Sequence, residues 1–155
     1  MSEQPLPPSV QTMRNTLSGG TGVTVGWNFV IAARSSVRWP LPVWGGVVGQ
    51  DDGRPPMLRA FYWLDGGAFG ELTLGDDGAE DPVKIAGSVR PVSNIETVEI
   101  TVEVLDSEAV RWNREIKVRF NDGHSISVTT AQSTTHFRDQ ANTFINAVLE
   151  AVAGR

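Results

Sequence analysis

The chain has 155 residues, of which 40% are hydrophobic and 20% charged, and its formal net charge is −5. This length and composition fit one globular domain with its own core and exclude a chain that is disordered throughout. The absence of cysteine excludes disulfides, thiolate metal sites and cysteine nucleophiles. The lysines are only Lys84 and Lys117 and the arginines are scattered, so we expect no nucleic-acid partner.

The amino-terminal residues lack the basic and apolar regions of a signal peptide, and no apolar run is long enough for a transmembrane segment. We therefore expect a cytoplasmic protein. Residues 1–20 contain several prolines and end in Ser18-Gly19-Gly20, which predicts a flexible amino-terminal arm. Residues 21–155 then form a single mostly-β domain.

From residue 22 to residue 130, short β-branched and aromatic runs alternate with Gly, Pro and Asp clusters. This pattern predicts about seven or eight mostly antiparallel strands, packed as a β-sandwich or a partly open β-barrel. The expected strands are 22–33, 41–49, 57–64, 68–74, 83–90, 95–105, 110–120 and 124–130. Most of the tryptophans lie between Trp27 and Trp63, where we expect them to pack in the core and on sheet faces.

Two of these strands show clear alternation of apolar and polar residues, which predicts one buried and one wet face. In residues 95–105 the apolar row is Val98, Ile100, Val102 and Val104. In residues 110–120 it is Val110, Trp112, Ile116, Val118 and Phe120. Arg114 interrupts the second row; it would either reach an internal partner or sit at a β-bulge, and we favour the bulge.

The turn between the last two expected strands follows from the phase of their apolar faces. A three-residue loop, Asn121-Asp122-Gly123, keeps Ile126 on the face of Val118, whereas a two-residue turn would put the faces out of phase. We therefore predict a G1 bulge with a left-handed glycine, in which Phe120 lies opposite His124 and Val118 opposite Ile126.

After Thr130 the spacing of apolar residues changes from that of a strand to that of a helix. One stripe contains Phe137, Ala141, Phe144, Ile145, Val148 and Val152. This predicts one carboxy-terminal amphipathic α-helix over about residues 135–153, packed on its own domain because an exposed stripe would leave a large apolar patch.

Patterns typical of catalysis are poorly represented. The histidines are His124, expected at a wet hairpin end, and His136, and neither stands in a recognisable nucleophile constellation. Carboxylates from different loops leave a hydrolase as a distant alternative. We expect no catalytic residues and no enzymatic activity.

The acidic, glycine-bearing loop at residues 75–81 is the one place where a hard-cation site is plausible. Its carboxylates come from Asp76, Asp77, Glu80 and Asp81, and calcium prefers such oxygen ligands. The spacing is not that of an EF-hand. The residues alone favour the alternative, a solvated hairpin loop whose charges keep a sheet edge soluble.

Four segments carry a resemblance to a known family. They are Val23-Thr-Val-Gly-Trp-Asn28, residues 39–53, Arg59-Ala-Phe-Tyr-Trp63, and Gly75-Asp76-Asp77 followed by the alternating strand from Ile95. In this order they resemble the TerD-like family of bacterial tellurium-resistance and stress proteins.

The resemblance implies a non-enzymatic, stress-associated β-sandwich that binds calcium at Asp76 and Asp77, with Glu80 or Asp81 as helpers. Positions where the family has aspartate hold Pro40, Pro42 and Asn28, so it implies a weak or vestigial calcium site. The carboxy-terminal helix departs from the family, which continues with further strand.

The strands, the last hairpin and the closing helix also look like the pleckstrin-homology-like architecture. That likeness implies an interaction scaffold for a protein or peptide. A lipid headgroup is disfavoured because no loop clusters lysine and arginine. The identity of the partner and the oligomeric state stay open.

Overall fold

The computed structural model describes residues 8–18, 25–38, 41, 43–49, 57–74, 84–131 and 135–154. In chain order its elements are α1 (Pro8–Ser18), α2 (Trp27–Ser36), β1 (Val43–Gly49), β2 (Met57–Asp65), β3 (Ala68–Thr73), β4 (Ala86–Pro91), the short 3-10 helix η1 (Val92–Asn94), β5 (Ile95–Asp106), β6 (Arg111–Phe120), β7 (Ser125–Thr129) and α3 (Thr135–Ala153). No helix in these ranges has both the length and the apolar character that crossing a bilayer requires.

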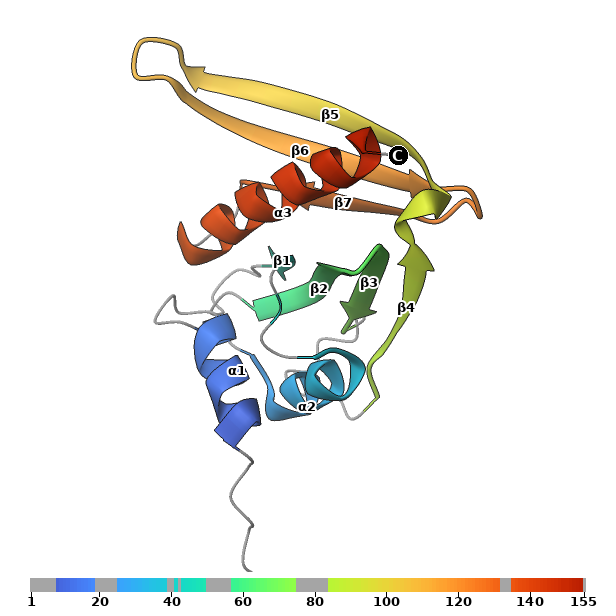
Figure 1. The fold of residues 1–155 in the computed structure, drawn as a ribbon. Helices are drawn as coiled ribbons and strands as arrows, with labels where there is room; N and C mark the ends of the chain where they lie inside the picture. Colours follow the sequence, from blue (N-terminus) through green and yellow to red (C-terminus); the bar gives the residue numbers. More distant parts are fainter. Residues whose placement is uncertain are drawn as a thin grey trace, which may run out of the picture.

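The strands form two antiparallel sheets, one in the order β1-β2-β3-β4 and the other in the order β5-β6-β7 (Figure 1). The predicted class is confirmed: the domain is mainly β and has a sandwich-like pair of sheets and one carboxy-terminal helix. Among the described residues the two sheets do not close into a single barrel. The helix α3 spans the residues that its apolar period predicted.

Helix α3 lies between the two sheets and completes the core there (Figure 1). Its buried stripe packs with Tyr62 and Phe69 of the first sheet and with Ile116 and Val118 of the second. The members from α3 are Ala141, Phe144, Ile145 and Val148, all fully buried. The stripe therefore packs on its own domain, as predicted.

A glycine on β1 sets how closely α3 can approach. A Cβ atom at Gly45 would lie 3.2 Å from the Cβ of Phe144, which is tighter than most real contacts. With no side chain at this position, the Phe144 side chain can lie directly against the β1 backbone.

A second core covers the opposite face of the first sheet, where α1 and α2 pack. Its centre is Phe61, whose ring centroid lies 5.9 Å from Phe29, 5.7 Å from Trp44 and 5.8 Å from Trp63. Trp44 and Trp63 are both 4% exposed, so the expected packing of tryptophans in the core holds for this pair.

The amino-terminal part of the chain differs from the prediction in two places. Residues 27–36, which overlap the second half of the expected strand 22–33, form α2. They do so because Phe29, Val30 and Ala33 make one helical face that packs on the sheet. Within the expected arm, residues 8–18 form α1, which buries Met13 and Leu17 at a helical spacing of four.

The predicted turn between β6 and β7 is confirmed. Gly123 has φ +91°, its amide donates to the Phe120 carbonyl at 3.0 Å, and the Phe120 amide donates to the His124 carbonyl at 2.8 Å. Val118 pairs with Ile126. The demand that both strands keep their apolar residues on one face therefore fixes the loop length.

Candidate functional site

The inner face of the β5–β6 hairpin is open, although the alternation predicted that it would be buried. Val102 is 55% exposed, Val104 64% and Trp112 40%. The prediction was wrong here because the hairpin projects past α3 and the first sheet, which cover only its base (Figure 1). We call the open residues the hairpin face: Ile100, Val102, Val104, Val110 and Trp112.

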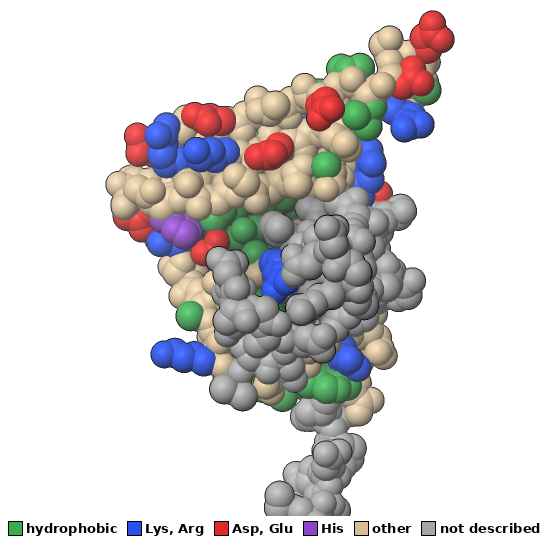
Figure 2. All heavy atoms as spheres, turned by 180° about the vertical axis from the view of Figure 1, so that it is seen from behind, with side chains coloured by type: hydrophobic (Ala, Val, Ile, Leu, Met, Phe, Trp, Pro, Cys, Tyr) green, Lys and Arg blue, Asp and Glu red, His purple; other side chains and the backbone are tan. Residues whose placement is uncertain are grey.

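The hairpin face continues the core without a break. Ile100 pairs with the fully buried Ile116. Towards the tip of the hairpin, the pairs that follow on the same face are Val102 with Arg114 and Val104 with Trp112. Of the eight large apolar side chains that are exposed in the described part of the chain, six lie on β5, β6 or the turn between them. On the outer face of the same sheet, acidic and basic side chains are intermixed (Figure 2). The two faces of one hairpin therefore differ sharply in polarity.

A groove of about 300 Å³ runs between the hairpin face and α3. Its lining is Ile100, Val102, Val104, Trp112, Arg114 and Leu149. It therefore offers mostly apolar surface with one cationic side chain at its edge.

Arg114 links β6 to α3 and supplies that charge. Its Nε donates to Asn142 Oδ1 at 3.1 Å, and its Nη2 donates to the Asn142 carbonyl at 3.1 Å and also to Asn146 Oδ1. The guanidinium carbon lies 5.6 Å from the centroid of the Trp112 ring. Burial lowers the pKa of Arg114, but these partners are uncharged oxygens, so the positive charge is not neutralised by them.

The favoured bulge at Arg114 was wrong. Arg114 pairs in register with Val102, and the register shifts of this strand pair lie elsewhere, near Ile95 and near Val104. The structure instead shows the other alternative, an internal partner, because Asn142 and Asn146 of α3 lie within hydrogen-bond distance of the Arg114 guanidinium.

The turn at the tip of the hairpin holds an apolar residue in an unfavourable conformation. Val110 has φ +53°, a region that β-branched residues rarely adopt, and it is 74% exposed. The Asp106 side chain accepts hydrogen bonds from the Glu108 and Ala109 amides, which closes the turn. The turn thus presents an apolar side chain at a position that suits glycine or asparagine better.

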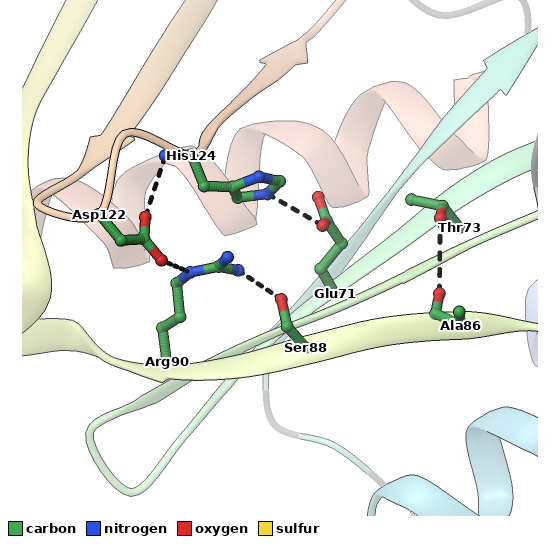
Figure 3. Close-up of polar contacts among 7 residues, drawn as sticks. All are labelled: Glu71, Thr73, Ala86, Ser88, Arg90, Asp122 and His124. Atoms are coloured by element: carbon green, nitrogen blue, oxygen red, sulfur yellow. Dashed lines mark hydrogen bonds and ion pairs between the residues drawn. The ribbon is translucent and has the colours of Figure 1, made fainter.

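A polar cluster joins the first sheet to the turn between β6 and β7 of the second (Figure 3). His124 Nε2 lies 3.0 Å from Glu71 Oε1, and Arg90 Nε lies 2.9 Å from Asp122 Oδ2. The Asp122 carboxylate also accepts the His124 amide at 2.9 Å, and this bond, followed by the Arg90 contact, lowers the pKa of Asp122. His124 is therefore half-buried against a carboxylate, which differs from the wet hairpin end expected for it.

This cluster links the two sheets, and only part of it lines a cavity. A cavity of about 380 Å³ touches Glu71 and Ser88, but neither His124 nor Asp122 contributes to its lining. Burial, and secondly the charge of Glu71, raises the pKa of Tyr62 to about 12. A tyrosine that stays protonated beside a paired carboxylate fits a structural role better than proton transfer near neutral pH.

The predicted calcium ligands Asp76, Asp77, Glu80 and Asp81 lie outside the described residues, so calcium binding stays a prediction. Within the described ranges, no group of three or more histidine, aspartate or glutamate side chains is arranged to hold a metal ion. Asn28, the counterpart of an aspartate in the TerD-like resemblance, lies in α2 and not in a strand.

Reasoning from the sequence did not identify Glu71 or the open hairpin face. For Glu71 a signal was present, since Phe69 and Glu71 share one face of β3 while Gly70 and Leu72 share the other, and both faces are buried. Comparison of the chain with models of protein families, with curated proteins and with solved structures finds no match.

Proposed function

We propose that this domain is a non-enzymatic interaction scaffold that binds a protein segment on its hairpin face. The observation that carries the proposal is the row of exposed apolar side chains from Ile100 to Val104, with Trp112 beside it. Soluble proteins seldom leave such a contiguous apolar surface open, and where they do it commonly serves recognition. Aromatic side chains such as Trp112 are enriched at the centres of protein interfaces.

The chemistry of the groove favours a particular partner. Its apolar lining suits a segment that presents two or three large apolar side chains, and Arg114 suits a carboxylate among them. The formal net charge of −5 argues against a nucleic acid as the occupant. The partner that fits is therefore an amphipathic acidic segment of another protein.

The order of elements also supports an interaction scaffold. A sheet of four strands, a sheet of three strands and a closing helix follow one another along the chain. Seven strands, a final hairpin and a closing helix are the elements from which a pleckstrin-homology-like scaffold was expected, whereas two separate sheets are the arrangement expected of a TerD-like domain. The helix fills the space between the sheets, which leaves the projecting hairpin as the surface that the fold does not use for itself.

Selection from a random peptide library displayed on phage, followed by binding measurements with the selected peptides, tests the proposal. We expect the selected peptides to combine large apolar residues with aspartate or glutamate. Synthetic versions should bind the wild-type protein and lose at least about tenfold in affinity, equivalent to 1.4 kcal/mol, to the variants Trp112→Ser and Arg114→Gln.

A matched control removes one cation from the outer face of the same strand. Arg119 is exposed there and lies 3.9 Å from Glu99, so Arg119→Gln changes the net charge as Arg114→Gln does. Peptide affinity should be unchanged in Arg119→Gln, and thermal melting should show that each variant is folded. Peptides whose affinity is the same for Trp112→Ser as for the wild type would overturn the proposal.

A further inference from the structure

We infer that two copies of this chain associate through the free edge of β5, which forms one continuous antiparallel sheet across both copies. The strand order places β5 at the edge of its sheet, where β6 is its hydrogen-bonded neighbour in the described part of the chain. An edge strand with unpaired backbone groups is a template for another strand. The occupant that fits best is β5 of a second copy. Three features favour it: the direction of the β5 backbone N–H and C=O groups, the register of the apolar residues, and the positions of the charges.

The backbone groups of the apolar β5 residues point to the free edge. Phe120 N donates to His124 O, and Thr130 N donates to Arg114 O, so the even-numbered residues of β6 bond to β7. Because backbone groups alternate in direction along a strand, the N–H and C=O groups of the odd-numbered β6 residues point to β5. There they pair with odd-numbered residues, such as Lys117 with Glu99. The β5 residues whose N–H and C=O groups face outward are therefore Val98, Ile100 and Val102.

The register centred on Ile100 satisfies both faces of the strand. If Ile100 lies on the two-fold axis opposite Ile100 of the second copy, Val98 lies opposite Val102 and Glu99 lies opposite Thr101 of that copy. Apolar residues then meet apolar residues, and each glutamate meets a threonine. The pairing stays inside the regular part of β5, because the register shifts with β6 lie near its two ends.

Charge rules out the neighbouring register. A two-fold axis at Thr101 would place Glu99 opposite Glu103 of the second copy on both sides of the axis, and like charges directly opposite destabilise a sheet. In the register centred on Ile100, Glu99 also keeps its basic neighbours in β6: it pairs with Lys117 and lies 3.9 Å from Arg119. No inward-pointing charge blocks the edge between Val98 and Val104.

Edge pairing leaves the β6 side of the groove free. It uses backbone groups along one side of β5, whereas Trp112 and Arg114 lie on β6 and line the groove. A dimer would place two hairpin faces side by side on one sheet and offer two equivalent grooves. The inference therefore stands apart from the proposed function, and the variants at Trp112 and Arg114 leave the paired edge intact.

Sedimentation equilibrium of the full chain without added peptide tests the association. We expect a mass of twice that of the chain at about 100 μM, and a monomer at the same concentration would overturn the inference. Ile100→Pro removes an outward-facing N–H without touching a hydrogen bond to β6, and it should convert the dimer to a monomer. Ile100→Lys, which places two cations together on the axis, should do the same if the proline variant fails to fold. A folded Ile100→Lys variant that stays dimeric would contradict the inference.

Disulfide formation tests the register, since the chain contains no cysteine of its own. The variants Glu99→Cys and Thr101→Cys, mixed and oxidised gently, should form a cross-linked heterodimer, because directly opposed residues of this kind have Cα atoms about 4.5 Å apart. Thr101→Cys alone should remain un-cross-linked. Cross-linking of Thr101→Cys alone that matches the mixture would overturn the register, and so would the absence of a cross-link in the mixture; the edge pairing itself is decided by the sedimentation experiment.

Discussion

His124 Nε2 lies 3.0 Å from Glu71 Oε1, and this contact ties the turn between β6 and β7 to the third strand of the other sheet. The Glu71 side chain is only 10% exposed, whereas that of His124 is 35% exposed. A carboxylate this well buried needs a hydrogen-bond donor, and the histidine supplies one from a different sheet. The relative position of the two sheets therefore depends partly on one turn.

We expect His124→Ala to lower the free energy of unfolding by about 1–2 kcal/mol near neutral pH, because Glu71 then loses its partner while it stays buried. Urea unfolding measures the loss. In a Glu71→Ala background the same substitution should cost much less, since the two effects are coupled. As a control, Glu99→Ala removes one partner of the exposed Arg119–Glu99 pair and should change stability by less than about 0.5 kcal/mol. Equal losses in both backgrounds would contradict a direct coupling.

Tyr62 should titrate near pH 12 in the folded protein, because burial and then the charge of Glu71 raise its pKa to about 12 from the usual 10.0. It is the only tyrosine, so the ultraviolet absorbance change of tyrosinate reports on it alone. The raised pKa favours the protonated form in the folded state, so its contribution to stability is complete below pH 10.0 and is lost as the pH rises through about 12. Glu71→Gln should move the midpoint towards 10.0. A midpoint near 10.0 in the folded wild type would show that the ring is accessible to solvent.

Gly70→Ala should destabilise the first sheet. A Cβ atom there would lie 2.0 Å from Cε2 of Trp63, the residue that pairs with Gly70 on β2. The indole would have to leave its buried position, at a cost of about 1–3 kcal/mol. Gly154→Ala is the control, because its Cβ would meet its nearest neighbour at an ordinary 3.4 Å. Thermal melting of both variants measures the difference, and equal midpoints would contradict the close packing of Trp63.

Calcium should raise the thermal midpoint slightly if residues 75–81 bind it, because a ligand that binds only the folded state stabilises that state. The double variant Asp76→Ala/Asp77→Ala should lose the shift, and magnesium at the same concentration serves as the control for ionic strength. No shift of the wild type at about 1 mM calcium, the weak end of protein calcium sites, would remove the calcium hypothesis and with it the basis for a TerD-like function.

The periodicity of the sequence predicted those elements whose faces are covered. The stripe through Phe144 and Val148 predicted α3, and the phase of Val118 and Ile126 predicted the three-residue turn, because in both cases burial selects one arrangement. The same reasoning was wrong for Val102, because alternation shows that a strand has an apolar face but does not show whether anything covers it. That depends on how far α3 and the first sheet reach, which is a tertiary property.

The amino-terminal helices were missed for a related reason. Short runs such as Trp27 to Ser36 contain β-branched and aromatic residues that suit a strand as well as a helix, and packing against the first sheet decides between them. The pair of Glu71 and His124 was missed because its members are 53 positions apart and no local pattern connects them. Arg114 of the candidate groove and its hydrogen-bond partner Asn142 were likewise separated, one on a strand and the other on the last helix.

The position of α3 between the sheets has a consequence for synthesis on the ribosome. All the strands that the structure describes precede α3 in the chain, yet the face of the first sheet around Gly45 is filled by Phe144, which is made about a hundred residues later. A nascent chain that has completed β7 therefore still exposes the apolar surfaces that α3 will cover. Packing of the core between the sheets must therefore wait until the helix has left the exit tunnel.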